Sequence, residues 1–402
     1  MAKAFNGIRI VDFSQVLAGP WCTTQFALLG AEVIKVEPPG TGEQCRSLNY
    51  NPTYKAKTMP PIFLAMNPGK RSIAIDLKHA RAKEIVHRLV ARADVVVQNF
   101  KVGVIDRLGF GYDALKAIKP DLVYCAISGY GQDGPKAETA AYDGAIQAAA
   151  GMMTITGHKA SGPARVGFQV VDMSTGLNAA FAIAAALYQR RLTGEGQYID
   201  VAMFDTALTM MAPNVSDWLN SGLVPEQLGA QSQAKSPVSD AFPTRNGHLT
   251  LIVVTDEHWQ KLCKVMGHAE WINDPRFRTG DARKANAAAL RTLLVDILRT
   301  DDTAAWIGRL SKAGVPAGSI ATIPEAVQEP QLAHRNLLMK MRPSQGLDYG
   351  PTLFNAPFKF AHDTPGTDLP PPAVGEHTDA VLAEIGYDAA AIQDLRSAKA
   401  IG

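Results

Sequence analysis

The chain has 402 residues, of which 47% are hydrophobic and 19% charged, and its formal net charge is +2 from 40 basic and 38 acidic residues. The length favours two domains over a single core, and the composition excludes an intrinsically disordered chain. The near-neutral charge balance argues against a polybasic surface for nucleic acid.

Short β-rich runs alternate with helical patterns through the first half of the chain. We predict strands over residues 8–13, 32–36, 72–76, 95–98 and 122–127, and helices over residues 20–29 and 79–93. This alternation predicts βαβ units and a mostly parallel sheet with helices on both faces. In such sheets ligands bind beyond the carboxyl ends of the strands. A long loop over residues 38–66 separates the second and third strands, and loops of that length are usually functional or disordered.

The pattern changes after residue 205. Residues 220–239 are rich in Gln, Ser, Pro and Gly, which predicts a linker. A strand over 249–254 and helices over 256–266, 282–299 and 303–313 predict a second unit, and two short helices are expected over 378–385 and 389–395. We therefore expect a large α/β domain beginning at 1–205, a linker at 206–240, a small domain at 241–316, and a return linker with the last part of the large domain at 317–402.

Asp172 is the leading candidate for chemistry. A short apolar run leads into it from Gly167, and Gly176 precedes an alanine-rich helix predicted over residues 177–188. Glycines allow a bound molecule to approach the backbone, and the N–H groups of a helix N-terminus can hold developing negative charge. Asp172 could therefore act as a carboxylate nucleophile, but aspartate is also a preferred N-cap. The spacing leaves both interpretations open.

The sequence also contains a G-x-G-x-x-G pattern at residues 129–134. Pro135 and polar residues follow it instead of an apolar helix, and the acidic residue expected about 20 positions later is missing. We interpret the pattern as a glycine-rich turn near a ligand and not as a dinucleotide site. The histidines form no metal-binding spacing, and no G-x-S-x-G elbow is present.

The expected compartment is the cytoplasm. The four cysteines are scattered without a C-x-x-C pair, as is typical of reduced thiols. The N-terminus lacks the apolar core of a signal peptide, and no run of about 18 apolar residues predicts a membrane span. We expect neither a membrane nor a nucleic acid as partner.

Ten short segments together resemble the class III CoA-transferase family, which includes formyl-CoA transferase and carnitine CoA-transferase. Each segment alone is weak, but ten in this order are specific. They are residues 7–13, 18–20, 29–37, 67–73, 94–100, 128–135, 142–143, 172–176, 193–197 and 375–379.

The resemblance implies a fold and a set of roles. It implies a Rossmann-like parallel sheet completed by the C-terminal segment, a smaller α+β domain, and an interlocked, ring-like homodimer. It implies that Asp172 is the nucleophile, that an acyl-CoA and a carboxylic acid are the substrates, and that no cofactor is permanently bound. The positions implied to hold CoA are Leu17, Ala18, Ile75, Asp76, Leu77, Lys78, Asn99, Phe100, Lys101, Arg107 and Tyr142.

Two further residues are candidates for contact with the acid. Gln15 follows the first predicted strand, and Arg46 lies in the long loop. Arg46 could pair with a distal carboxylate, which would favour dicarboxylic acids such as succinate or glutarate. The alternative is that Arg46 is a surface arginine.

Some positions depart from formyl-CoA transferase. Leu17 replaces a glutamine, Ala140 and Pro38 replace basic residues, and residues 230–239 carry Gln, Lys and Ser in place of a glycine-rich lid. These departures argue against formate or oxalate as substrate. The α-methylacyl-CoA racemases of the same superfamily have a histidine at the position of Tyr142, and a tyrosine is a poor base at neutral pH.

We therefore expect transfer of CoA through an anhydride and then a thioester on Asp172. Candidate oxyanion donors are the backbone N–H groups of residues 174–176 or of the glycines at 129–134. A CoA-thioester racemase and a non-catalytic acyl-CoA-binding protein are the alternatives.

Overall fold

The computed structural model describes residues 3–48, 50–51 and 58–402. The chain forms two compact units. Unit 1 comprises Met1–Ala150, Gly167–Leu219 and Gln331–Gly402, and unit 2 comprises Gly151–Val166 and Asn220–Pro330. The segment for which the sequence predicts a linker, residues 206–240, begins with ordered helix: α9 spans Met203–Met210 and α10 spans Ala212–Ser221.

Unit 1 is built on a six-stranded, entirely parallel sheet of order β3-β2-β1-β4-β5-β6. This is the order of doubly wound dinucleotide-binding folds, in which the strand order reverses between β1 and β4. The mixed α/β fold with a parallel sheet is confirmed, although β6 was not predicted. The strands are β1 (Arg9–Asp12), β2 (Glu32–Glu37), β3 (Lys70–Ala74), β4 (Val95–Gln98), β5 (Val123–Ser128) and β6 (Tyr198–Ala202).

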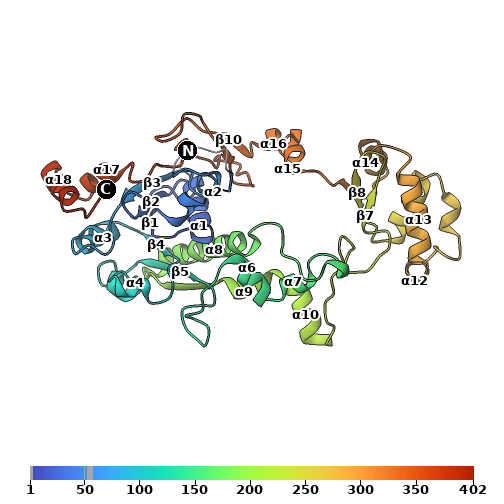
Figure 1. The fold of residues 1–402 in the computed structure, drawn as a ribbon, viewed down its shortest axis with the longest axis horizontal. Coiled ribbons are helices and arrows are strands. Elements are labelled where there is room, and N and C mark those ends of the chain that lie inside the picture. The colour runs from blue at the N-terminus through green and yellow to red at the C-terminus, as the bar shows by residue number, and fades with distance from the viewer. Residues whose placement is uncertain (1–2, 49, 52–57) are drawn as a thin grey trace. The chain divides into compact units, whose positions relative to one another are not determined.

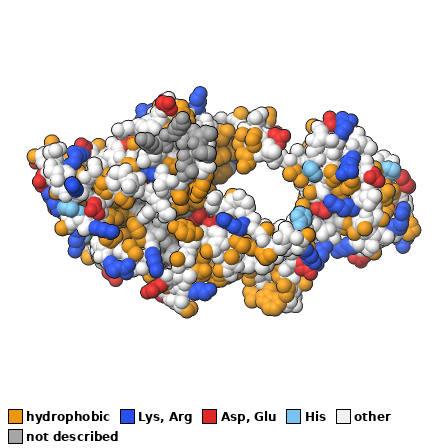
Figure 2. Space-filling view, viewed as in Figure 1, with side chains coloured by type: hydrophobic (Ala, Val, Ile, Leu, Met, Phe, Trp, Pro, Cys, Tyr) orange, Lys and Arg blue, Asp and Glu red, His pale blue; other side chains and the backbone are white. Residues whose placement is uncertain are grey.

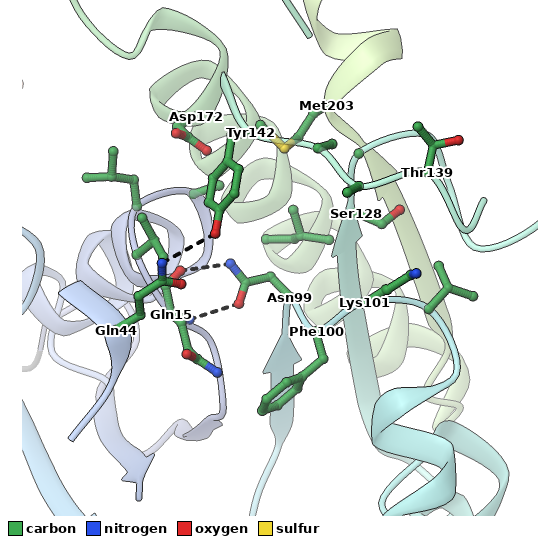
Figure 3. A pocket seen from close by; sticks show the side chains of 18 of the residues that line it. Gln15, Gln44, Asn99, Phe100, Lys101, Ser128, Thr139, Tyr142, Asp172 and Met203 are labelled. Atoms are coloured by element: carbon green, nitrogen blue, oxygen red, sulfur yellow. Dashed lines mark hydrogen bonds between the residues drawn. The ribbon is translucent and has the colours of Figure 1, made fainter. Parts of the chain in front are cut away.

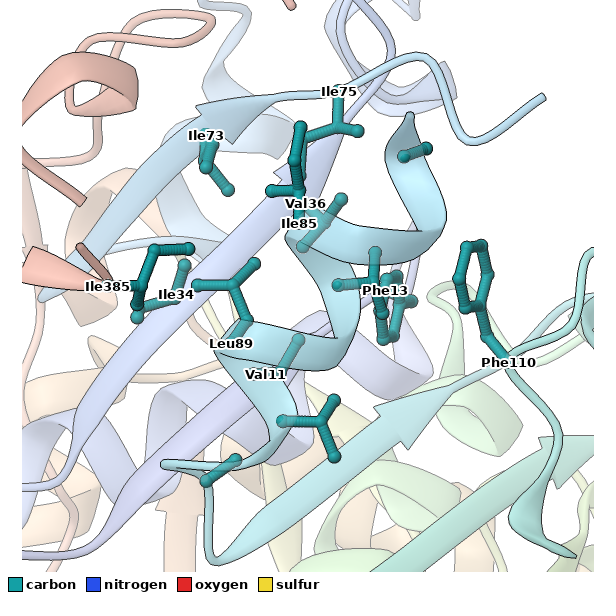
Figure 4. Packing of buried hydrophobic residues seen from close by; sticks show 14 of the residues in the cluster. Val11, Phe13, Ile34, Val36, Ile73, Ile75, Ile85, Leu89, Phe110 and Ile385 are labelled. Carbon is teal, nitrogen blue, oxygen red and sulfur yellow. The ribbon is translucent and has the colours of Figure 1, made fainter. Parts of the chain in front are cut away.

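Each face of this sheet carries its own core, because successive strand side chains point to opposite faces. On one face Val11, Ile34 and Val96 pack with α3 (Ala82–Val90) and with helices from the end of the chain (Figure 4). On the other face Ile10 and Val95 pack with α1 (Ala18–Leu28) and α8 (Val170–Thr193). The valine-rich strands are buried on both sides, as parallel strands generally are.

The C-terminal segment belongs to unit 1, as Figure 1 shows where the red helices return beside the blue strands. Val381 of α17 (Thr378–Glu384) and Leu395 of α18 (Ala389–Ser397) lie in the core on the face of the sheet that α3 covers. Ile401 forms an antiparallel bridge with Ile75, and the Ala74 N–H donates to Thr378 Oγ1 at 3.1 Å. The chain therefore begins and ends in the same unit.

The helices of unit 1 are short, apart from α8. Helix α8 begins at Val170 and runs for 24 residues, and Gly194, with a φ of +79°, ends it. The helices and the small antiparallel sheet are α1 (Ala18–Leu28), η1 (Gln44–Ser47), α2 (Pro61–Met66), α3 (Ala82–Val90), α4 (Val104–Arg107), α5 (Tyr112–Lys116), α6 (Asp143–Ala149), α8 (Val170–Thr193), α16 (Pro330–Arg335), α17 (Thr378–Glu384), α18 (Ala389–Ser397), β10 (Leu338–Lys340) and β11 (Thr352–Phe354).

Helix α8 requires a qualification to the membrane prediction. By length and composition it is apolar enough to cross a bilayer, and it is the one such helix among the described residues. Of its most apolar window, 44% is buried, and Ala179, Ile183 and Ala186 pack in the core beside the sheet. A core helix of a globular domain meets the same criteria.

Unit 2 has its own sheet and core. Its three strands are antiparallel in the order β7-β8-β9, and Trp259 and Leu294 are buried at its centre. The predicted helix over 282–299 is divided at Asn286 into two helices. The elements are α7 (Met152–Ile155), η2 (Lys159–Ser161), β7 (Ala241–Pro243), β8 (His248–Leu251), α11 (Asp256–Val265), η3 (Ala269–Ile272), α12 (Gly280–Ala285), α13 (Ala287–Leu298), α14 (Thr303–Lys312), β9 (Ala317–Ser319) and α15 (Ile323–Ala326).

Candidate active site

A cavity of about 320 Å³ lies in unit 1 beyond the carboxyl ends of β1 and β4. This is the place where the strand order reverses and where ligands bind in open α/β sheets. Its lining comes from segments that follow β1, β4 and β5, together with α8 and α9 (Figure 3). The lining residues are Gln15, Val16, Leu17, Ala18, Gln44, Asn99, Phe100, Lys101, Val102, Ile127, Ser128, Gly129, Ala137, Thr139, Ala140, Ala141, Tyr142, Asp172 and Met203.

The turn between β1 and α1 forms one wall of this cavity. The Asn99 side chain brackets it, because the Gln15 N–H donates to Asn99 Oδ1 and Asn99 Nδ2 donates to the Gln15 carbonyl, both at 2.8 Å. Val16 follows with a φ of +67°. Across the cavity mouth, Gln44 Nε2 donates to the hydroxyl of Tyr142 at 3.3 Å (Figure 3).

Asp172 reaches the cavity from the first turn of α8. The helix begins at Val170, two residues earlier, so Asp172 lies inside it and the N-cap interpretation is wrong. The cap is supplied from elsewhere: Oδ2 of Asp143, in α6, accepts hydrogen bonds from the Val171 N–H at 2.8 Å and the Asp172 N–H at 3.1 Å. The Asp172 carboxylate is therefore not needed to satisfy its own helix.

The electrostatic environment of Asp172 disfavours its ionised form. Burial raises the pKa of the carboxyl, and the negative charge of Asp143 raises it further, from 3.8 to about 7. Carboxyl groups are shifted upward by both desolvation and a nearby like charge. At neutral pH the group is therefore divided between acid and carboxylate, and its carboxylate is more basic than that of an ordinary aspartate.

Gly176 explains how α8 comes this close to α1. A Cβ at this position would lie 2.6 Å from the Ala18 carbonyl oxygen and 3.0 Å from Trp21 Cδ1. Only a glycine permits that separation of the two backbones. The contact lies one helical turn beyond Asp172, so it holds Asp172 beside the cavity wall that Ala18 forms.

The position of α8 also corrects the expected oxyanion donors. The Met173 N–H already donates to the Gln169 carbonyl, and residues 174–176 follow within the helix. In an α-helix only the first N–H groups lack an intrahelical partner. The N–H groups of residues 174–176 are therefore occupied, whereas Gly129 lines the cavity.

The structure gathers eight of the predicted site residues at the cavity: Gln15, Leu17, Ala18, Asn99, Phe100, Lys101, Tyr142 and Asp172. Other predicted CoA contacts lie outside the lining. Ile75, Asp76, Leu77 and Lys78 follow β3, with Lys78 exposed and Ile75 buried in the core. Arg107 is the exposed last residue of α4.

Arg46 does not reach the cavity, which corrects both interpretations of this residue. Its guanidinium is buried and forms two hydrogen bonds with the Glu37 carboxylate, each of 2.6 Å. The remaining donors reach the carbonyls of Thr58 and Pro372 at 3.0 Å and Met59 Sδ at 3.3 Å, and the group stacks 3.7 Å from the centre of the Phe63 ring. A guanidinium engaged in this way has no donor left for a distal carboxylate.

Further buried charges, on β1 and β3, are paired with each other. Asp12, at the end of β1, accepts hydrogen bonds from Thr23 Oγ1 at 2.7 Å and Lys70 Nζ at 3.1 Å. Burial opposes ionisation of Asp12, but Lys70 and Lys35 outweigh it and lower the pKa of its carboxyl to about 2. Burial lowers the pKa of Lys70 to about 8. Both values leave the Asp12–Lys70 pair ionised at neutral pH.

Several lining residues were not predicted from the sequence. Ser128 ends β5, Met203 directly follows β6, and Thr139 lies in the loop after the glycine-rich turn. The rule that ligands lie beyond strand carboxyl ends marks Ser128 at the end of the predicted strand β5, and it would have marked Met203 had β6 been predicted. Gln44 carries no signal in the sequence, because only the folding of the long loop brings it to the cavity.

The comparisons with known proteins agree with this fold. Residues 5–378 match the model of a protein family described as CoA-transferase family III. The chain is 35% identical to succinyl-CoA:glutarate CoA-transferase of Mus musculus over 98% of this chain and 89% of the relative. It is 38% identical to acetyl-CoA:oxalate CoA-transferase of Acetobacter aceti over 84% and 85%. The crystal structure of a CAIB/BAIF family protein from Brucella suis superposes with a TM-score of 0.86 at 35% identity, covering 96% of this chain and all of that one.

Proposed function

Because this chain belongs to CoA-transferase family III and is a CoA-transferase, we propose that Asp172 is the residue that carries the acyl group and then CoA. The observation that supports this role is one carboxylate, with its pKa raised to about 7, at the wall of the cavity beyond β1 and β4. A carboxylate that its surroundings stabilise poorly is a stronger nucleophile.

The proposed reaction begins with attack of an Asp172 oxygen on the thioester carbonyl of the donor. The carbon–sulfur bond breaks, CoA leaves as the thiolate, and a mixed anhydride forms on Asp172. The thiolate then attacks the aspartyl carbonyl and breaks its bond to the anhydride oxygen. The donor acid departs as a carboxylate, and Asp172 is left as a CoA thioester.

The acceptor acid reverses these steps. Its carboxylate attacks the aspartyl thioester, CoA thiolate leaves, and the thiolate then attacks the acceptor's carbonyl in the new anhydride, which regenerates the Asp172 carboxylate. Asp172 carries no charge when the acceptor arrives, so of the two neighbouring carboxylates only Asp143 still repels the incoming acid. The complete reaction cycle neither takes up nor releases a net proton, and it needs no external energy source.

CoA itself is proposed to bind along residues that lead away from the cavity. The cavity residues Asn99, Phe100, Lys101 and Tyr142 would hold the part nearest the thioester. The segment at residues 75–78 and Arg107 supply an exposed ammonium and guanidinium suited to phosphates. These contacts follow from the family resemblance.

The acceptor is proposed to be a dicarboxylic acid, because the mouse relative is named for succinyl-CoA and glutarate. Since Arg46 is occupied by Glu37, the second carboxylate needs another partner. Lys101 is the one cation among the described lining residues, and Gln15 and Gln44 provide uncharged amide donors there. Succinyl-CoA is the proposed donor.

A homodimer is proposed as the working assembly, and the interlocked arrangement and the cytoplasmic location remain predictions. Four apolar side chains of α8, Leu177, Phe181, Tyr188 and Leu192, are each at least 50% exposed and lie at spacings that share one helix face. Further hydrophobic side chains gather over α10 (Figure 2). Exposed apolar surface of this kind usually marks a protein–protein contact.

The test is transfer between succinyl-CoA and isotopically labelled glutarate, followed by mass spectrometry. The wild type should form labelled glutaryl-CoA, and D172A should form none while keeping its fold. Borohydride or hydroxylamine treatment of the wild type with succinyl-CoA should mark the Asp172 peptide. Full transfer by D172A refutes the role, and α-proton exchange with solvent without any acid acceptor identifies a racemase instead.

A further inference from the structure

The backbone of Val16 adopts a conformation that β-branched residues rarely take. Its φ is +67°, and a non-glycine residue in this region is strained by about 1–3 kcal/mol, so the conformation persists only where its surroundings impose it. Val16 lines the cavity between Gln15 and Leu17. The contacts that impose this conformation therefore also set the shape of the cavity wall.

Glu43 supplies the contact to the strained residue itself. Its Oε2 accepts a hydrogen bond from the Val16 N–H at 3.0 Å and another from the Cys45 N–H at 2.8 Å. The residue is only 2% exposed. One carboxylate oxygen thus joins the β1–α1 turn to η1, and these are the two segments that present Val16 and Gln44 to the cavity.

Glu43 is in turn fixed by buried charges. Its N–H donates to Glu37 Oε2 at 3.0 Å, and Glu37 is held by Arg46. Its Oε1 has no hydrogen-bond partner among the described residues and lies 3.6 Å from Lys35 Nζ. The Lys35 ammonium donates to the Ser14 carbonyl at 2.8 Å, so the ion pair holds both Ser14 and Val16.

We propose that Glu43 is a positioning residue for CoA transfer, one that keeps the turn at residues 14–17 and the side chain of Gln44 in fixed, neighbouring places on the wall of the cavity (Figure 3). Glu43 does not itself line the cavity. It acts through the N–H groups of Val16 and Cys45. Without it, Val16 relaxes to negative φ and the peptide groups beside it reorient. The inference rests on the proposed function of the cavity.

The experiment is a double-mutant cycle of E43A and V16G, with kcat and KM measured for transfer from succinyl-CoA to glutarate. Glycine adopts positive φ without penalty, so a glycine at residue 16 should hold the turn without help from Glu43. Because the strain at Val16 is then no longer supported, E43A should lower kcat by about 5- to 150-fold when residue 16 is valine. In the V16G background, E43A should lower kcat by less than about threefold.

The KM for succinyl-CoA should change little in every variant, because the proposed phosphate contacts lie at Lys78 and Arg107. E43Q keeps an oxygen that can accept hydrogen bonds from both N–H groups, so kcat should fall less in E43Q than in E43A. If E43A does not fold, E43Q replaces it in the cycle. E32A is the control: Glu32 is ion-paired with Arg9 and Arg71 but lies outside the cavity, and kcat should be unchanged.

An equal loss of kcat with valine and with glycine at residue 16 overturns the inference, as does a wild-type kcat in E43A. The thermal unfolding temperature supplies a readout that needs no activity, because V16G should restore part of the stability that E43A removes. A wild type that transfers no CoA refutes the proposed function, whereas the coupling in stability still tests how Glu43 and Val16 depend on each other.

Discussion

Replacing Asp172 by asparagine should make the protein more stable at alkaline pH while abolishing transfer. Asparagine has nearly the same shape but no charge. The folded wild type retains the Asp172 proton up to about pH 7, whereas the unfolded chain loses it near 3.8. The folded state therefore binds more protons in this window, and the free energy of unfolding of the wild type falls as the pH rises through it.

The magnitude follows from the two pKa values. The difference between 3.8 and about 7, at about 1.36 kcal/mol for each pH unit, amounts to about 4 kcal/mol once the pH exceeds 7. Asp172 is only partly buried, and a carboxylate in the first turn of a helix is favoured by up to about 1 kcal/mol. We therefore expect D172N to exceed the wild type by about 2–3 kcal/mol at pH 8 and by about 1 kcal/mol at pH 5, and to equal it only below about pH 4, where the unfolded chain also keeps the proton.

Thermal unfolding of both proteins at pH 5, 6, 7 and 8 measures this difference. For a domain of this size, 2–3 kcal/mol corresponds to about 5–10 °C in Tm. The matched control is D205N, since Asp205 also occupies the first turn of a helix, α9, but is exposed. D205N should follow the wild type at every pH. A D172N difference that is the same at pH 5 and pH 8 refutes the reasoning about burial and charge.

Three further outcomes are expected. Since the attacking group is the ionised carboxylate, kcat/KM should rise about tenfold per pH unit below pH 7 and level off above it; a flat profile contradicts this. G176A should cost about 1–3 kcal/mol and most activity, because its Cβ meets the Ala18 carbonyl oxygen, whereas G308A in α14, with no atom within 4 Å, should be neutral or slightly stabilising. R46M should lower the free energy of unfolding by about 3–5 kcal/mol by leaving Glu37 buried without its partner, and a shift in preference between mono- and dicarboxylic acids would show that Arg46 binds substrate after all.

Local patterns predicted most of the sheet. The runs around Ile10, Val33 and Val96 are short, rich in β-branched residues and separated by helical patterns, which is the signal of parallel strands. Strand β6 was missed because its residues, Tyr198–Ala202, alternate in burial at the edge of the sheet and begin only five positions after the last residue of α8. An edge strand is defined by its neighbour, here β5, and this pairing joins residues far apart in sequence.

The site was predicted where family motifs or strand ends mark it, and not where distant segments meet. Asp172 could be found from its frame of glycines, but not its place inside α8, because the cap comes from Asp143 in another helix. Arg46 appeared free because its partner, Glu37, ends a strand that precedes the loop. Gln44 reaches the cavity only because these buried charges fold the loop. Local sequence patterns carry no signal for such long-range electrostatic pairing.

The two-segment origin of unit 2 has a practical consequence for anyone who dissects this protein. A fragment containing only residues 220–330 would lack residues 151–166, although Gln227 Nε2 donates to the carbonyls of Thr156 and Gly162 at 2.6 Å and the Gly229 N–H donates to that of Gly157 at 2.9 Å. In such a fragment the Gln227 side chain and the Gly229 N–H would lose these acceptors, and residues 151–166 would stay with the rest of the chain. Truncation, domain exchange and circular permutation must therefore cut the polypeptide at two places or keep both segments together.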